Sequence, residues 1–229
     1  FLDYIEPDLN LSRKVVLRHD PRETSPEYRT YNVEHFGAMV GGKPDITFSV
    51  PWDVLSSTAA RAVMDGKQLW FSADVDKSMS YEHGILSTEA FDFEKILNTT
   101  FSDDKAANLD VHISAPTHAM VLFGVDVEDD NPDKVRKWKV ENSWGENSGG
   151  MDPGYFMMTQ EWFSKYGYEI VVDIDYLDEE TQQAYDKYEF DPILLPFNDA
   201  FGAVARYNPR YFFDHNHFPY EDDNLFSQV

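Results

Sequence analysis

Two strand-like stretches separated by a turn-rich segment most constrain the fold of this chain. Residues 117–126 are apolar and strand-like, residues 137–144 alternate between apolar and polar, and residues 124–133 are rich in Gly, Asp, Asn and Pro. A turn of this kind joins strands that pair side by side. A Gly-rich loop, a strand, a short helix and another strand follow, at residues 145–154, 155–158, 160–166 and 168–173. We therefore expect an antiparallel meander in which neighbours in sequence are neighbours in space.

Other local signals outline the rest of the chain. Residues 45–50 predict a strand that leads into a helix, which begins near Pro51 and ends at Gly66. The expected buried face of that helix consists of Leu55, Ala59, Ala62 and Val63. We further expect a strand at 68–75, one short helix that contains Phe91, Phe93 and Ile96, and a helix at 179–188. Beyond Pro192 we expect an irregular arm that lies on another surface.

These patterns predict three parts of the chain. Residues 1–30 are polar and turn-rich, which predicts an irregular N-terminal segment with short extended pieces. Residues 31–178 carry the expected strands and form the main body. Residues 179–229 form a C-terminal helix and an extended acidic arm.

Composition excludes several classes of function. Seventeen Phe, 13 Tyr and 5 Trp favour a packed globular body. The net charge of −23 repels phosphate backbones, so we expect no nucleic-acid partner. The sequence has no apolar run of about 18 residues, which a membrane-spanning helix needs, so we expect no membrane association. The chain has no Cys, which excludes disulfides, thiolate metal sites and a thiol nucleophile among its own residues.

A histidine and an asparagine in the two central strands are the candidate catalytic residues. His118 lies early in the first strand and Asn142 near the end of the next, so a hairpin brings them side by side. The amide oxygen of Asn142 can accept a proton from one imidazole nitrogen and leave the other free to pair with a nucleophile. Trp144, two residues beyond Asn142, can shield that hydrogen bond from water. Such a pair also occurs as satisfied structural partners, so spacing alone leaves both interpretations open.

Local motifs resemble a known peptidase family. The strings that carry the resemblance are Thr117-His-Ala-Met, Lys137-Trp-Lys-Val-Glu-Asn-Ser-Trp-Gly, Gly154-Tyr-Phe, Tyr31-Asn-Val-Glu-His-Phe-Gly and Asp65-Gly-Lys-Gln-Leu-Trp-Phe. In this order they resemble the papain-like cysteine peptidases, and more closely the bleomycin hydrolase and aminopeptidase C family. The resemblance implies a papain-like α+β fold, of which this chain supplies mainly the antiparallel β-rich half plus a C-terminal arm.

The same resemblance implies a catalytic or supporting role for each of these residues. His118 would act as general base and acid, Asn142 would orient it, and Trp144 would shield the pair. The family's nucleophilic Cys and oxyanion-hole Gln belong to a preceding segment, so we expect a Cys-bearing N-terminal segment or companion chain. The alternative is a catalytically inactive homologue that serves as a scaffold or regulatory subunit. Ser143 is not expected to replace the thiol, because strand alternation points it to the opposite face from Asn142.

The C-terminus departs from the family pattern. Relatives tend to end soon after a segment that residues 195–205 match, and their terminal carboxylate lies in the active-site cleft. Gly202 and Ala205 are therefore expected to be cleft or arm residues, and residues 206–229 are expected to block the cleft or redirect specificity. Asp214, His215 and His217 in this tail form only a weak metal motif, so we expect no metal and no organic cofactor. The resemblance further implies peptide substrates, a homohexamer and a cytoplasmic location.

Overall fold

The computed structural model of the chain describes residues 13–36, 44–146, 148–150 and 152–202. Among these residues one 11-stranded sheet has the strand order β11-β2-β3-β1-β10-β4-β7-β8-β9-β6-β5. Along the chain the elements are β1 (Lys14–Arg18), β2 (Arg29–Val33), β3 (Thr47–Ser49), α2 (Trp52–Met64), β4 (Leu69–Ala73), β5 (Met79–Ser80), β6 (Ile85–Leu86), α3 (Phe93–Leu97), α4 (Lys105–Asp110), β7 (His118–Glu128), β8 (Asn131–Glu141), β9 (Tyr155–Thr159), α5 (Gln160–Tyr166), β10 (Gly167–Asp173), η2 (Ile174–Tyr176), α6 (Glu179–Tyr188) and β11 (Ile193–Leu195). No helix in this described part has the length and apolar character needed to cross a membrane.

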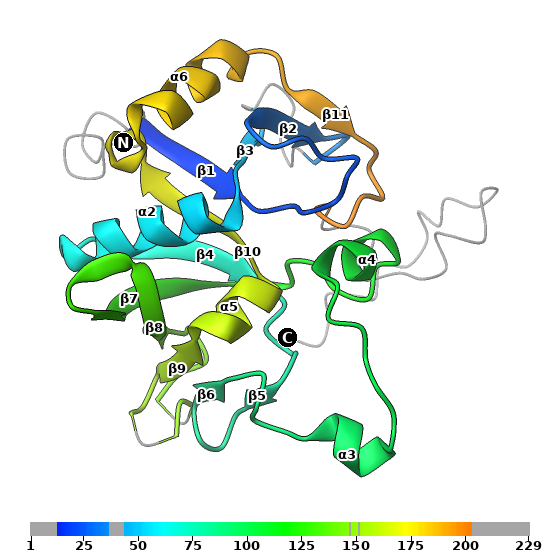
Figure 1. Cartoon of the computed structure of the whole chain (residues 1–229), viewed down its shortest axis with the longest axis vertical. Helices are drawn as coiled ribbons and strands as arrows, with labels where there is room; N and C mark the ends of the chain where they lie inside the picture. Colours follow the sequence, from blue (N-terminus) through cyan, green and yellow to red (C-terminus); the bar gives the residue numbers. More distant parts are fainter. Residues whose placement is uncertain (1–12, 37–43, 147, 151, 203–229) are drawn as a thin grey trace, which may run out of the picture.

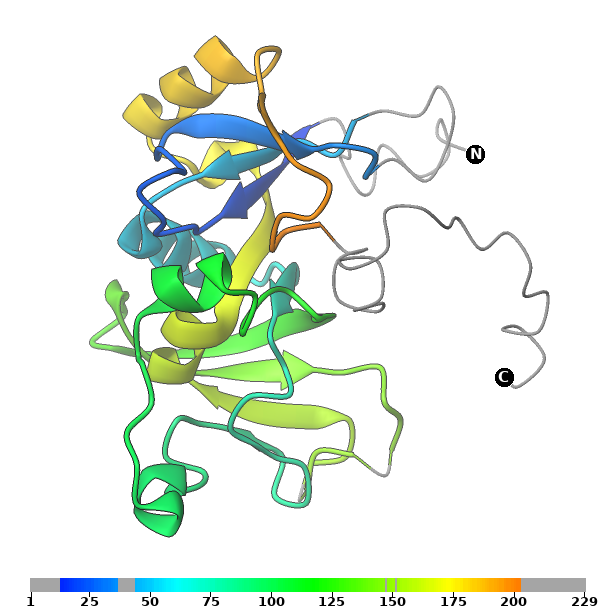
Figure 2. The same cartoon turned by 90° about the vertical axis from the view of Figure 1, so that its right-hand side faces the viewer.

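The main core lies between the sheet and the helices that cover one of its faces. Figure 1 shows α2 crossing the sheet and α5 lying below it, and Figure 2 shows α2, α5 and α6 on the same side of the strands. The four residues predicted for the buried face of α2 are all buried, as the helical spacing requires. At the end of α2, Gly66 adopts a φ of 78°, the left-handed conformation that commonly terminates a helix.

The hairpin β7–β8 is longer and tighter than the sequence predicted. Its strands extend to Glu128 and from Asn131, so the expected turn at 124–133 is wrong in length. The turn itself consists of Asp129 and Asp130, whose φ values are 46° and 55°. Two successive left-handed residues form the kind of turn that matches the twist of paired strands, and Asp tolerates that conformation better than most residues do.

The expected meander holds for β7, β8 and β9 but fails at β10. β8 pairs antiparallel with both β7 and β9, whereas β10 pairs with β1 and β4. The other edge of β9 is already occupied by β6, which pairs with it in parallel. Helix α5 carries the chain from β9 to β10, and its Trp162 and Phe163 are buried in the main core. Local patterns predicted β7, β8, β9, α5 and β10 but not this crossover.

The end of the described chain packs onto the body of the molecule. Residues beyond Pro192 were expected to be irregular and to lie on another surface, but β11 pairs in parallel with β2. A second apolar cluster follows, with members from β2, α4, β10 and the C-terminal residues Leu195, Ala200 and Phe201. The division of the chain into three parts at residues 31 and 179 stays a prediction. Strands from all three parts join the same sheet, since it includes β1 and β11.

Candidate active site

Strand register brings the predicted site residues together at one end of the central sheet. His118 is the first residue of β7 and pairs with Ala73 of β4. On the other side of β7, Val121 pairs with Glu141, so the residues directly after β8 lie beside the start of β7. Asn142 is held there by its backbone N–H, which donates to the carbonyl of Gly154 at 2.9 Å. The hairpin thus places a histidine and an asparagine 24 positions apart side by side.

One hydrogen bond fixes the orientation of the imidazole. Nε2 of His118 lies 2.9 Å from Oδ1 of Asn142, and the backbone N–H of Ser143 donates to the same Oδ1 at 2.8 Å. Because an N–H needs an acceptor, the Ser143 contact identifies this amide atom as the oxygen. Nε2 of His118 must then carry the proton, and Nδ1 is left with the lone pair that a general base needs. The hydrogen bond that the sequence predicted is therefore present.

Trp144 stacks on His118 and closes one side of the pair. The ring centroids are 5.0 Å apart and the ring planes differ by 24°. Tyr81 and Phe156 pack against Trp144 in turn, each with a centroid distance of 6.0 Å. A stacked indole face attracts an imidazolium electrostatically and keeps water from the hydrogen bond. Sequence reasoning placed Trp144 here but missed Tyr81, whose segment carries no strand or helix period.

The amide nitrogen of Asn142 lacks a partner among the described residues. Asn142 is only 8% exposed, and its Nδ2 is buried without a hydrogen bond. Leaving a buried amide donor unpaired costs about 1–3 kcal/mol. The site therefore presents a donor that an acceptor from outside the described residues would satisfy.

The remaining predicted site residues lie elsewhere or outside the described residues. Gly202 is buried, and its N–H donates to the carbonyl of Asp199 at 2.8 Å. A Cβ at this position would lie 2.5 Å from the carbonyl oxygen of Phe197, so the turn requires glycine. Ala205 and the tail motif Asp214, His215 and His217 lie outside the described residues. Within the described ranges, no group of three or more acidic, histidine or cysteine side chains could hold a metal ion.

A mixed sheet with an adjoining His–Asn pair and a covering tryptophan defines a papain-like architecture. The sequence model of the Peptidase C1-like family matches residues 1–202, and the chain belongs to that family. Bleomycin hydrolase of Gallus gallus is 38% identical over 205 residues, which cover 89% of this chain and 44% of the relative. Aminopeptidase C of Lactococcus lactis subsp. cremoris is 39% identical over 204 residues, with coverages of 89% and 44%.

A solved structure agrees with the family assignment. The crystal structure of PepW from Lactobacillus rhamnosis HN001 matches with a TM-score of 0.82 and 34% identity, over 87% of this chain and 44% of the other. This likeness confirms the expected papain-like α+β fold. The chain spans less than half the length of each of these three relatives.

Proposed function

We propose that this chain supplies the histidine and asparagine of a cysteine peptidase active site, with the nucleophilic Cys provided from outside these 229 residues. The observation that carries the proposal is the His118–Asn142 hydrogen bond at 2.9 Å under a stacked Trp144. The absence of Cys from the sequence requires the second part of the proposal. The relatives' greater length leaves room for such a segment, because the matched region covers 44% of them.

The geometry supports acyl transfer through a thiolate. Nδ1 of His118 accepts the proton of the thiol, and the resulting thiolate attacks the peptide carbonyl carbon. The imidazolium then donates that proton to the leaving amine as the peptide C–N bond breaks and a thioester remains. In the second half, Nδ1 takes a proton from water while the water oxygen attacks the thioester carbon. The C–S bond then breaks, the imidazolium returns its proton to the thiolate, and the acyl group leaves as a carboxylic acid. Asn142 holds the ring through Nε2 in both halves, so no rotation of the imidazole is needed.

Peptides are the substrates that this chemistry implies. An aminopeptidase specificity, a homohexameric assembly and a role for residues 206–229 in directing specificity belong to the same proposal and rest on the resemblance to bleomycin hydrolase and aminopeptidase C. The unpartnered Nδ2 of Asn142 supports the presence of a further segment at this site. An acceptor on the Cys-bearing segment would remove the free-energy cost of leaving this buried amide donor unpaired.

The test is peptide hydrolysis by the native assembly in which His118→Ala has been introduced. The proposal expects hydrolysis to be lost, since no other group in the account accepts the thiol proton. His83→Ala is the matched control, because the exposed His83 also hydrogen bonds a neighbour, Ser80, at 2.9 Å. Full activity in the His118 variant would overturn the proposal. Absence of hydrolysis and of thiol labelling in the wild-type assembly would instead favour the inactive scaffold.

A further inference from the structure

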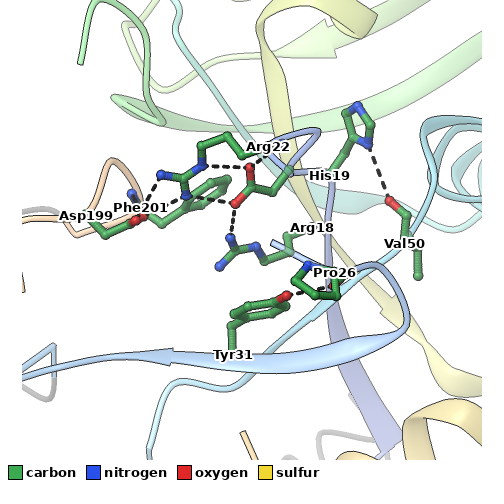
Figure 3. Close-up of polar contacts among 9 residues, drawn as sticks. Arg18, His19, Arg22, Pro26, Tyr31, Val50, Asp199 and Phe201 are labelled. Carbon is green, nitrogen blue, oxygen red and sulfur yellow. Dashed lines mark hydrogen bonds and ion pairs between the residues drawn. The ribbon is translucent and has the colours of Figure 1, made fainter. Parts of the chain in front are cut away.

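A buried ionic cluster ties the C-terminal end of the described chain to the loop after β1. Arg22 donates from Nε and Nη2 to Asp20 at 2.9 and 2.8 Å, and from Nη1 and Nη2 to Asp199 at 3.0 and 3.1 Å (Figure 3). All three side chains are at most 8% exposed. Two-pronged contacts between an arginine and carboxylates are strong and directional. We call Asp20, Arg22 and Asp199 the ionic latch.

The ionic latch fixes the position of Phe201. Oδ1 of Asp199 accepts the backbone N–H of Phe201 at 3.0 Å. The Phe201 ring lies 3.9 Å from the guanidinium carbon of Arg18, which also hydrogen bonds to Asp20 (Figure 3). Tyr168 also packs against Phe201, and the two rings meet edge-on at a centroid distance of 5.8 Å. Phe201 thus connects the latch to the second apolar cluster.

A β-bulge aims Tyr168 at this cluster. In the pairing of β10 with β4, Gly167 faces Ala73 and Glu169 faces Ser72, so the register shifts at Tyr168. Bulges re-aim a side chain, and here Tyr168 joins the second cluster whereas Ile170 lies in the main core. Strict alternation would have placed both on one face.

The hydroxyl of Tyr168 contacts the segment that leads into His118. It lies 2.6 Å from Oγ of Ser114, which also donates to Asp74 at 2.8 Å. Asp74 directly follows Ala73, the β4 partner of His118. The N–H of Thr117 then donates to the carbonyl of Ala73 at 3.0 Å. The entry of the chain into β7, and so the placement of its first residue, is held by these contacts.

We propose that Tyr168 is a positioning residue for His118, and that the ionic latch holds Tyr168 in place through Phe201. The expected effect on kcat rests on the proposed peptidase function, whereas the positioning of His118 does not. The contacts run from Asp199 through Phe201, Tyr168 and Ser114 to Asp74. Asp74 directly follows Ala73, whose carbonyl accepts the N–H of Thr117, the residue before His118. In this proposal Tyr168 and Asp199 act only on where the imidazole of His118 lies.

The test compares Tyr168→Phe, Asp199→Asn and the double variant in the native assembly that contains the Cys-bearing part. Tyr168→Phe removes one hydrogen bond, whereas Asp199→Asn removes one of the two carboxylate charges that Arg22 contacts. Through the position of His118, each single variant is expected to lower kcat about fivefold. KM is expected to change by less than about twofold, because positioning of the general base affects the transition state more than substrate binding. The double variant should resemble the worse single variant, since residues in one chain of contacts are not additive. Tyr176→Phe is the control, because its hydroxyl likewise makes a side-chain hydrogen bond, in this case to the carboxylate of Asp65 at 3.2 Å.

A second readout does not depend on peptidase activity. Hydrogen–deuterium exchange at the imidazole C2 position, measured by mass spectrometry, reports the environment of His118 separately from the other histidines. The exchange rate is expected to change at His118 in both single variants and to stay unchanged in Tyr176→Phe. Unchanged His118 exchange in either single variant would overturn the proposal. An inactive wild-type assembly would refute the proposed function, while the exchange measurement would still decide the positioning role.

Discussion

The rings of His118 and Trp144 stack at a centroid distance of 5.0 Å, although His118 begins β7 and Trp144 lies in the loop that follows β8. The register of β7 with β8 produces this contact, because Val121 faces Glu141 and the chain continues from there toward Trp144. Asn142 lies between them in sequence and bonds to the same imidazole. One hairpin register therefore sets both the orientation and the covering of the proposed general base.

Asn142→Ala is expected to lower kcat about 10–100-fold. The substitution removes a hydrogen bond that becomes charge-assisted in the imidazolium state, which contributes about 1.5–3 kcal/mol. Steady-state peptide hydrolysis by the native assembly measures the effect. Ser143→Ala is the matched control, because only its backbone N–H contacts Asn142 and its side chain is exposed. Equal losses in the two variants would show that the Asn142 side chain has no special role.

Trp144 offers a graded test of ring stacking. Trp144→Phe keeps an aromatic face on His118, whereas Trp144→Ala removes the face and exposes the hydrogen bond to water. We expect the alanine variant to lose about 1–2 kcal/mol of transition-state stabilisation, roughly tenfold in kcat/KM, and the phenylalanine variant to lose less. The same peptide assay measures both. An alanine variant as active as the phenylalanine variant would contradict the shielding role.

The ionic latch predicts a loss of stability in acid. Burial alone would raise the pKa of Asp20, but the hydrogen bond from Arg22 and the charges of Arg18 and Arg22 outweigh it and lower this pKa to about 2. A folded pKa below the unfolded value of about 3.9 stabilises the fold fully above that pH, and the contribution of about 2.5 kcal/mol is lost as pH falls from about 4 toward 2. Urea unfolding at pH 5, 4, 3 and 2 measures it.

Asp20→Asn supplies the comparison for this acid transition. The variant keeps the side-chain shape but leaves Arg18 and Arg22 without their shared carboxylate, which is expected to cost about 3–5 kcal/mol at neutral pH. Its remaining stability should fall less steeply between pH 4 and pH 2 than that of the wild type. Parallel curves for the two proteins would show that Asp20 does not carry the acid sensitivity.

Removal of residues 206–229 tests the proposed role of the C-terminal extension. If the extension blocks or redirects the cleft, the truncated assembly should show a different ratio of N-terminal to internal cleavage on one peptide set. Mass spectrometry of the products measures that ratio. A shorter truncation after residue 218, which removes the acidic run but keeps residues 206–218, separates the two halves of the extension. An unchanged cleavage profile after the full removal would refute this role.

Local sequence patterns predicted the elements better than their connections. The buried face of α2 follows from helical spacing, and its limits follow from the end signals at Pro51 and Gly66. Helix α6 spans the residues expected, Glu179–Tyr188. The His118–Asn142 contact was predictable because both residues lie in one hairpin, whose register is local. The parallel pairing of β11 with β2 was not, because three residues carry no period and the partner is far away in sequence.

The buried polar contacts could not be predicted from the sequence either. Arg22 and Asp199 are 177 positions apart, and nothing in either neighbourhood indicates the other. Tyr168 would have been placed in the main core by strand alternation, and only the bulge after Gly167 turns it away. The physical cause is common to both cases, since long-range packing decides which polar groups meet once the local elements have formed.

The proposed peptidase requires a nucleophilic Cys that lies outside these 229 residues. Intact-mass analysis of the native particle under denaturing conditions, with and without an irreversible thiol-directed peptidase inhibitor, tests it directly. We expect that a second polypeptide, or a longer form of this one, gains the mass of the inhibitor, and that the gain disappears when His118 is replaced by Ala. A particle in which no Cys-bearing polypeptide is present and nothing is labelled would contradict the account.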